Sequence, residues 1–310
     1  MRIIFFGTGK FAIPSLKRLM NSRHEVLAVV TLPDAKSGRG MNPRPTPVKA
    51  FIEQAAPAIP VFQPGKVNDK KFTDPLRLLE ADVFVVIDYG SKLSKELLGL
   101  PAKYCVNLHP SLLPKYRGAS PVNWAILSGD KETGNTVIKM AEQMDAGDII
   151  TQKATAIGDD EDAVSLEERL SQAGAELLAD TLEAIEKGEE RPVKQDESKA
   201  SYAPRLQKKQ GRIDWSEDAA IIERKVRGMK PWPGTFTYLN KKLLKIHGAR
   251  ITDTGSNAGK PGTFEDTAGF IVRTGKGALQ ITRLQPEGKR VMTAEEFLRG
   301  TTPGPDAALE

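Results

Sequence analysis

The sequence predicts an α/β protein in which a mostly parallel sheet, covered by helices on both faces, is followed by a small β-barrel. Two observations carry this prediction. Through residue 189, short apolar runs rich in β-branched residues alternate with helical patterns, an order typical of a parallel sheet. From Gly211 onward, one helical segment is followed by short, closely spaced strand patterns with turn residues between them, which is typical of a barrel.

The N-terminal part supplies the elements of the predicted sheet. Apolar runs predict strands at Arg2–Phe6, Glu25–Thr31, Pro60–Phe62, Asp82–Asp88, Tyr104–His109, Asn135–Met140 and Ile149–Lys153. Helical patterns lie between and after them at Phe11–Met20, Pro47–Ala55, Asp74–Glu80, Asn123–Ser128 and Val164–Lys187. The first strand, turn and helix therefore open a Rossmann-like arrangement, with ligands expected beyond the carboxyl ends of the strands.

The domain boundaries follow from a change in composition. Residues 190–207 are polar and show no hydrophobic periodicity, which predicts a linker. We therefore expect a Rossmann-like domain over 1–189, a linker over 190–207 and an OB-like β-barrel domain over 208–310. The predicted helix of the second domain, Glu217–Met229, has acidic residues in its first turn and basic residues in its last, as the helix dipole favours.

The composition excludes several classes of protein. Among the 310 residues, 39% are apolar and 27% charged, and no apolar run has the length of a membrane span. Met1 and Arg2 run directly into a strand pattern, so we expect no secretory leader. One cysteine, Cys105, permits no intrachain disulfide, and three histidines far apart in sequence form no local metal motif. We expect a cytoplasmic protein without a metal.

The net charge of +5 is concentrated in the C-terminal part. Residues 206–310 contain 18 Lys and Arg against 12 Asp and Glu, whereas the rest of the chain is close to neutral. This excess fits a polyanionic partner such as RNA, and it fits equally well a surface that is merely solubilising.

Gly7–Ala12 matches the dinucleotide-binding pattern G-x-G-x-x-A. The match follows a predicted strand and precedes a predicted helix, as that motif requires. Asp34 follows the second strand at a distance suited to a ribose-binding acid. One hypothesis is therefore an NAD-dependent oxidoreductase.

A second constellation predicts proton-transfer chemistry. Strand alternation places Asn107 and His109 on one face at the carboxyl end of a predicted strand. A rigidly held imidazole beside a carboxamide is suited to proton transfer and to stabilising an oxyanion. Asp145, in a loop with Gly147, is the natural third member, because a carboxylate orients an imidazole and supports its positive charge.

Seven segments extend this constellation over nearly the whole chain: GTGKFAIPSL, TLPDAKSGRG with PTPVK, NLHPSLLPKYRGASPVNWAILSGD, TGNTVIKMAEQMDAGDII, RIDWS, KPWPGTFT and LQPEGKRVMTAEEFLRG. The first four resemble enzymes that use 10-formyltetrahydrofolate in general. Together with the last three, the chain resembles the methionyl-tRNA formyltransferase family.

The resemblance implies a reaction and roles for individual residues. It implies transfer of a formyl group from 10-formyltetrahydrofolate to the α-amine of methionine on initiator tRNA, with Asn107, His109 and Asp145 as the catalytic trio. It implies a folate site at Ser111, Leu112, Leu113 and Pro114, with the pterin near Tyr89, Gly90 and Leu93. It implies tRNA contacts at Arg39, Arg44, Lys208, Lys209 and Arg212, a monomer and no metal.

Four positions bear on the resemblance. The family usually has Pro at Gly9, a small apolar residue at Asp88 and Pro at Ser94, whereas Pro110 is one of its ordinary residues. The alternatives that remain are a formyltransferase for an amino-sugar nucleotide, a formyltetrahydrofolate hydrolase and, more remotely, the NAD-dependent oxidoreductase. The basic C-terminal segments argue against the hydrolase, and the SLLP and DAGD segments have no role in an oxidoreductase.

Overall fold

The structure is a computed structural model that describes residues 1–37, 42–252, 259–301, 303–304 and 307–310. The chain divides into two compact units. Unit 1 comprises residues 1–121, 132–156 and 167–203, and unit 2 comprises residues 122–131, 157–166 and 204–310. The chain thus passes between the units more than once. The boundaries predicted at 189 and 207 remain a prediction.

Unit 1 contains a seven-stranded sheet in the order β5-β2-β1-β6-β7-β8-β9. Its strands are β1 (Arg2–Gly7), β2 (Glu25–Val30), β5 (Val61–Phe62), β6 (Val83–Ile87), β7 (Tyr104–His109), β8 (Glu132–Lys139) and β9 (Ile149–Ala156). The first five run parallel, and β8 and β9 are antiparallel to their neighbours. The predicted mostly parallel α/β sheet is confirmed.

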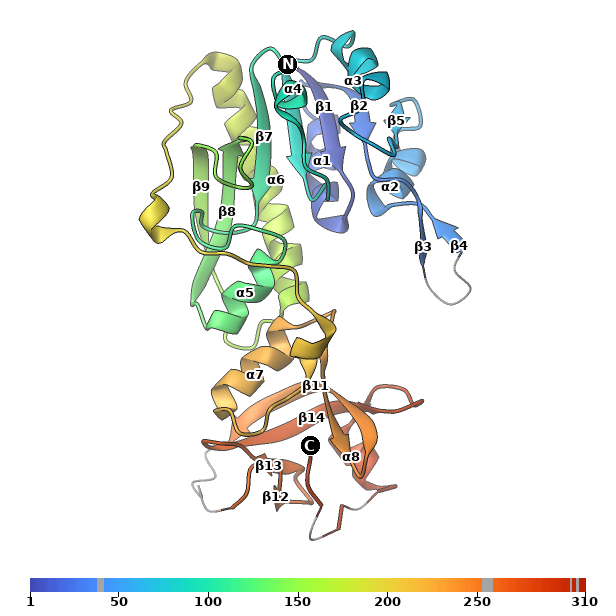
Figure 1. Ribbon diagram of the computed structural model, residues 1–310, viewed down its shortest axis with the longest axis vertical. Coiled ribbons are helices and arrows are strands. Elements are labelled where there is room, and N and C mark those ends of the chain that lie inside the picture. The colour runs from blue at the N-terminus through green and yellow to red at the C-terminus, as the bar shows by residue number, and fades with distance from the viewer. Residues whose placement is uncertain (38–41, 253–258, 302, 305–306) are drawn as a thin grey trace. The chain divides into compact units, whose positions relative to one another are not determined.

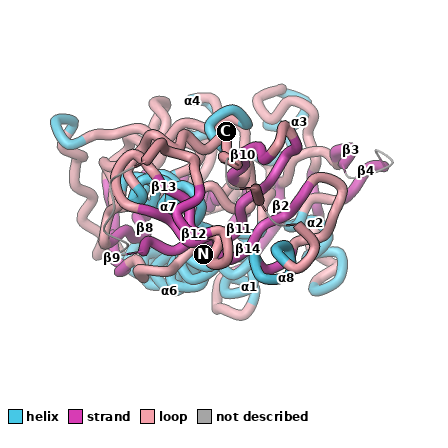
Figure 2. Tube along the Cα trace, turned by 90° about the horizontal axis from the view of Figure 1, so that it is seen from below, coloured by secondary structure: helices cyan, strands magenta, loops and turns pink. Residues whose placement is uncertain are grey.

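Helices cover both faces of this sheet. Ile4, Phe6, Phe84 and Val86 share one buried cluster with residues of α3 (Lys70–Arg77) and α4 (Lys95–Leu98). The alternate residues Ile3 and Phe5 are also fully buried, so they face the opposite side. On that side lie α1 (Ile13–Met20) and α6 (Ala163–Lys187), as Figures 1 and 2 show. The remaining elements are α2 (Pro47–Ala55) and the short 3-10 helices η1 (Lys10–Ala12) and η2 (Glu197–Lys199).

Several local features of the structure differ from the sequence-based expectation, and two of them lie in unit 1 near the sheet. Helix α3 begins four residues before the predicted start at Asp74, because the Asp69 carboxylate accepts a hydrogen bond from the amide of Lys71 and caps the helix there. It ends before Glu80, which has the left-handed φ of 45°. The strands β3 (Ala35–Ser37) and β4 (Asn42–Arg44), which pair with each other, were not expected.

Unit 2 contains an antiparallel sheet in the order β10-β11-β14-β13-β12, with β15 paired to β14. Its strands are β10 (Thr235–Leu239), β11 (Lys242–Thr252), β12 (Phe264–Asp266), β13 (Ile271–Arg273), β14 (Ala278–Pro286) and β15 (Met292–Thr293). Its helices are α5 (Pro121–Ser128), η3 (Lys208–Gly211), α7 (Ala219–Gly228) and α8 (Ala294–Leu298). Closure of this sheet into a barrel is not confirmed and stays a prediction.

The C-terminal residues contact both edges of that sheet. Leu309 forms an isolated bridge with Leu239 at the end of β10, and Ala308 forms one with Thr263 beside β12. Leu309 is buried in the hydrophobic core of unit 2. The last described residues are therefore part of the packed structure of this unit.

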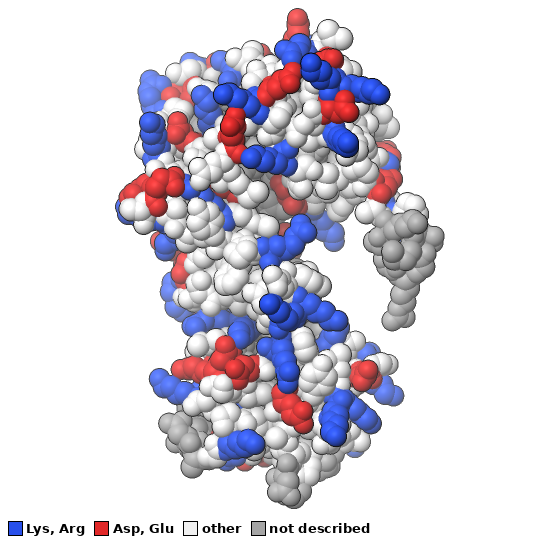
Figure 3. All heavy atoms as spheres, viewed as in Figure 1, with Lys and Arg blue, Asp and Glu red and all other residues white. Residues whose placement is uncertain are grey.

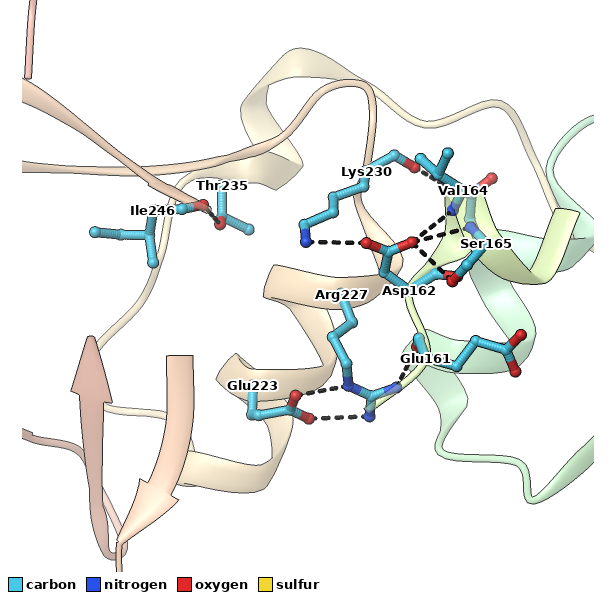
Figure 4. A network of polar contacts seen from close by, with 10 residues as sticks. Glu161, Asp162, Val164, Ser165, Glu223, Arg227, Lys230, Thr235 and Ile246 are labelled. Carbon is cyan, nitrogen blue, oxygen red and sulfur yellow. Dashed lines mark hydrogen bonds and ion pairs between the residues drawn. The ribbon is translucent and has the colours of Figure 1, made fainter. Parts of the chain in front are cut away.

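A polar network within unit 2 ties residues 157–166 to α7 and the chain after it (Figure 4). Asp162 pairs with Lys230 at 3.0 Å. Arg227 binds the Glu223 carboxylate through two hydrogen bonds of 2.6 and 2.9 Å and donates to the carbonyl of Glu161 at 2.8 Å. Among the described residues, no helix is long and apolar enough to cross a membrane.

Candidate active site

The end of β7 carries the residues predicted to do the chemistry. His109 is buried, and Asn107 on the same face of the strand is half-buried. The Nε2 atom of His109 lies 2.9 Å from the carbonyl oxygen of Tyr116. Because a carbonyl oxygen only accepts hydrogen bonds, Nε2 carries a proton, and Nδ1 is the nitrogen that remains for chemistry.

Asp145 faces that nitrogen. Its Oδ2 atom lies 3.8 Å from Nδ1 of His109 and accepts a hydrogen bond of 2.9 Å from the amide of Gly118. The separation of 3.8 Å is that of an ion pair and exceeds a direct hydrogen bond. The structure therefore brings the predicted trio to one end of the sheet, with Asp145 fixed by the backbone of the loop that follows His109.

The predicted folate segment Ser111–Pro114 lies in that same loop. Ser111 and Leu113 are buried, and the Ser111 hydroxyl donates to the carbonyl of Lys115 at 2.6 Å. The Leu113 amide donates to Thr136 Oγ1 at 3.2 Å, and the Leu113 carbonyl accepts from Gln152 at 2.9 Å. Leu112 and Pro114 are half-buried. If this segment contacts a ligand through side chains, those of Leu112 and Pro114 are the more available.

The predicted pterin residues offer backbone more than side chains. Tyr89 and Leu93 belong to the buried cluster of unit 1, and burial raises the pKa of the Tyr89 phenol to about 12. Gly90 is exposed and has a φ of 87°, a conformation that favours glycine. Ser94, where proline is usual, caps α4 and donates its amide to Asn68 Oδ1 at 2.8 Å, a bond that proline cannot make.

Asp88 and Gly9, the other two unusual positions, are direct neighbours. A Cβ atom built on Gly9 would lie only 1.7 Å from Oδ2 of Asp88, so glycine is what gives this carboxylate its room. Asp88 is exposed, although the protein around it partly desolvates its carboxylate. This desolvation, with the negative charge of Glu167 as a smaller cause, raises the pKa of Asp88 to about 6.

This arrangement argues against a dinucleotide at Gly7–Ala12. A carboxylate beside Gly9 would repel a diphosphate at the turn where the motif would bind it. Asp34, the candidate ribose ligand, already accepts hydrogen bonds from Lys49 at 2.8 Å and from Gln63 at 2.7 Å, and these bonds lower its pKa. Both of its oxygens are therefore engaged by protein groups.

The predicted tRNA contacts fall on both units. Arg44 is exposed at the end of β4 in unit 1, and Arg39 lies outside the described residues. In unit 2, Lys208 and Lys209 are exposed on η3, and the Arg212 guanidinium lies 5.7 Å from the centre of the Tyr238 ring. Figure 3 shows Lys and Arg side chains gathered over this part of unit 2. No cluster of three potential metal ligands occurs among the described residues.

Two residues that sequence reasoning missed lie directly behind the trio. Arg117 is a buried residue of the loop that follows β7, and Gln195, within the segment predicted as a linker, donates to the carbonyls of Asp145 and Gly147. Arg117 belongs to the NLHPSLLPKYRG segment and was visible there, whereas nothing in the local sequence marks Gln195.

Comparison with known proteins decides between the remaining readings. Residues 1–182 match the family model described as formyl transferase, and residues 205–302 match that of the formyl transferase C-terminal domain. The methionyl-tRNA formyltransferase of Citrifermentans bemidjiense is 46% identical over 302 residues, which cover 97% of this chain and 93% of that protein. That of Caldanaerobacter subterraneus subsp. tengcongensis is 44% identical over 301 residues, which cover 97% of each.

The chain belongs to the methionyl-tRNA formyltransferase family. It is a formyl-transferring enzyme, and the oxidoreductase hypothesis is not favoured. Among solved structures, the sugar 3N-formyl transferase WlaRD is similar with a TM-score of 0.69 and 19% identity, over 94% of this chain and 99% of that one. HypX from Aquifex aeolicus is similar with a TM-score of 0.65 and 20% identity, over 96% of this chain and 47% of that one. These two likenesses show the fold alone.

Proposed function

We propose that this enzyme transfers the formyl group of 10-formyltetrahydrofolate to the free α-amine of methionine on initiator tRNA. The observation that carries the proposal is the trio at the end of β7, where buried His109 turns Nδ1 toward Asp145 at 3.8 Å on the face of the strand that also carries Asn107. Full-length similarity to methionyl-tRNA formyltransferases supports the choice of acceptor.

The proposed chemistry is a direct transfer. The neutral amine attacks the formyl carbon, a C–N bond forms, and the carbonyl oxygen becomes an oxyanion. Asn107 stabilises this oxyanion with its amide N–H, and the protonated His109 does so through Nδ1, while the Asp145 carboxylate stabilises the positive charge of the ring. The bond from the carbon to N10 of the folate then breaks, the amine loses one proton and N10 gains one.

The loop after β7 and the segment after β6 form the proposed folate site. Leu112 and Pro114 contact the flat heterocycle, and Ser111 and Leu113 hold the loop from inside through their hydrogen bonds and burial. The pterin meets the backbone around Tyr89, Gly90 and Leu93, where the positive φ of Gly90 turns the exposed chain.

The tRNA is held mainly by charge. Lys208, Lys209, Arg212 and Arg44 bind phosphates without sequence preference, and exposure leaves all four accessible. Arg39 reads the unpaired end of the initiator tRNA by stacking or by forked hydrogen bonds. Substitution Arg39→Ala should therefore reduce the preference for initiator over elongator methionyl-tRNA. We further propose that the enzyme acts as a monomer in the cytoplasm, where its aminoacylated substrate is made.

The test supplies 10-formyltetrahydrofolate with three acceptors in parallel: methionyl initiator tRNA, methionyl elongator tRNA and a nucleotide-linked amino sugar. Formyl-methionine is measured after the ester bond to tRNA is hydrolysed. We expect rapid formylation of the initiator tRNA and little of the other two. Preferential formylation of the sugar would support the alternative acceptor, and release of free formate without any acceptor would support a hydrolase.

A further inference from the structure

One buried arginine connects the two hydrogen bonds that hold the catalytic pair. Arg117 is 1% exposed. The residue before it, Tyr116, supplies the carbonyl that binds His109 Nε2, and the residue after it, Gly118, supplies the amide that binds Asp145. The backbone of Arg117 is itself paired with Ser201 and Ala203, at 2.9 and 2.8 Å. The chain on both sides of Arg117 is therefore fixed with respect to the site.

The guanidinium of Arg117 binds side chains of the segment after α6, and two of them accept two hydrogen bonds each. Its Nη1 and Nη2 atoms donate to the Glu197 carboxylate at 2.9 and 2.7 Å. Its Nε and Nη2 atoms donate to Oε1 of Gln195 at 3.1 and 2.8 Å. The hydrogen bonds to Glu197 are the main cause that raises the pKa of Arg117. The group is charged whenever the enzyme is active.

These contacts fix the orientation of the Gln195 amide. A guanidinium can only donate, so the oxygen of Gln195 must face Arg117 and its NH2 group must face away. On that other side, Nε2 donates to the carbonyl oxygens of Asp145 and Gly147, each at 2.7 Å. Both ends of the amide thus require the same orientation, and the side chain links Arg117 to the backbone that carries Asp145.

The backbone that Gln195 holds would not adopt this conformation readily by itself. Asp145 has a φ of 53°, in the left-handed region that a residue with a Cβ adopts only with support. Two residues further, a Cβ on Gly147 would lie 1.8 Å from the carbonyl oxygen of Lys139, so the loop packs closely against the end of β8. The two hydrogen bonds from Gln195 hold this turn, and the turn sets the direction of the Asp145 carboxylate.

We infer that Gln195 is a positioning residue for catalysis: held by Arg117, it fixes the turn that aims the Asp145 carboxylate at His109. The inference rests on the proposed function, because it assigns a consequence for formyl transfer. The segment predicted from the sequence as a linker would then supply part of the active-site framework. Gln195 itself acts through Asp145, and it needs no contact with either substrate.

The decisive variant is Gln195→Glu. A carboxylate keeps an acceptor for Arg117, so the fold should be preserved, but it cannot donate to the carbonyls of Asp145 and Gly147. We expect kcat to fall between about tenfold and 100-fold, as for small misplacements of reacting groups. The KM values for 10-formyltetrahydrofolate and for methionyl-tRNA should change less than about threefold. Asp196→Ala is the matched control, because this neighbouring exposed carboxylate binds Ser198 and Lys199 instead.

A double-mutant cycle separates positioning from general destabilisation. In an Asp145→Asn background, Gln195→Glu should cost much less in kcat than it does in the unsubstituted enzyme, because the group that it positions has lost its charge. Fully additive losses, or unchanged kcat in Gln195→Glu with intact thermal stability, would overturn the inference. If the unsubstituted enzyme makes no formyl-methionine, the proposed function itself has failed, and the two failures are thus distinguishable.

Discussion

The catalytic residues and the residues proposed to bind tRNA differ in how firmly the structure holds them. His109 is 5% exposed, and both of its ring nitrogens face a named protein group. Lys208 and Lys209, in contrast, are exposed on a short 3-10 helix, and no ion pair among the described residues restrains them.

This difference corresponds to the work proposed for each region. Formyl transfer requires the oxyanion-stabilising groups to be in place before the reaction, because groups that are already oriented cost no reorganisation energy in the transition state. Binding to a polyphosphate requires positive charge at approximately the right distance and tolerates mobile side chains. Substitutions near the trio should therefore change kcat or stability. Substitutions of the exposed basic residues in unit 2 should change the affinity for tRNA and its dependence on salt.

The largest expected effect is that of His109→Ala. It removes the group that stabilises the oxyanion, and we expect kcat to fall by about 10²- to 10⁴-fold. The Kd for methionyl-tRNA, measured by filter binding, should change less than about threefold. His247→Ala provides the control, since that half-buried histidine lies in unit 2 and hydrogen-bonds Gln285. Equal losses of turnover and tRNA binding would contradict the separation of roles.

The next effect concerns packing beside the site. In Gly9→Ala the new Cβ meets Oδ2 of Asp88, the end of an exposed side chain that can rotate away, and we expect a loss of at most about 1 kcal/mol in the free energy of unfolding. In an Asp88→Ala background the same substitution should be close to neutral, as urea titration would show. Gly65→Ala is the matched control, because its Cβ would meet no atom within 4 Å. Equal costs in both backgrounds would contradict a coupling between these two positions.

The sequence predicted most of the helices and strands whose signal is local, that is, contained in the residues of the element itself. The strands of unit 1 and the long helix were found because apolar runs and periodicity are local signals, and the predicted helix Val164–Lys187 differs from α6 by one residue. The start of α3 was missed because a cap by one carboxylate outweighed the apolar pattern that begins later. The pair β3 and β4 is short and polar, so it gave no periodic signal.

The contacts that complete the site were beyond such reasoning. Gln195 hydrogen-bonds the carbonyl of Asp145, which lies 50 residues away in the sequence, and the side chain of Arg117, which lies 78 residues away. No local sequence pattern predicts contacts between residues so far apart. Gly9 and Asp88 were each noted as unusual, but only the three-dimensional structure shows that one makes room for the other. The trio could be predicted because strand alternation and residue chemistry pointed to its three members and the family resemblance agreed, whereas their supporting network depends on tertiary packing.

In unit 2 the expected effects are smaller and depend on salt. Replacing Lys208 and Lys209 together by alanine should raise the KM for methionyl-tRNA about tenfold at low salt and leave kcat unchanged. The slope of log affinity against log salt concentration should decrease by between about 1.4 and 1.8, since each phosphate contact contributes about 0.7–0.9. Substitution of Lys276 and Lys289, which are also exposed in unit 2, is the charge-matched control. An unchanged salt slope would show that Lys208 and Lys209 only solubilise the surface.

The smallest expected effect is a pH dependence of stability from Asp88. Its pKa in the folded protein is about 6, above the ordinary value of 3.8, so the charged form destabilises the fold at neutral pH. That cost is present above pH 6 and disappears as the group is protonated between pH 6 and pH 3.8. Asp88→Asn should therefore raise the Tm by a few degrees at pH 7 and make little difference near pH 4.

The effect stays small because water reaches part of the Asp88 side chain and screens its charge. Glu167→Gln offers the internal check, since the negative charge of Glu167 is the second cause of the raised pKa of Asp88. In that background the gain from Asp88→Asn at pH 7 should be reduced but not abolished, because desolvation is the larger cause. A gain that grows as the pH falls would have the wrong sign, and it would mean that the Asp88 carboxylate finds a stabilising partner in the folded enzyme.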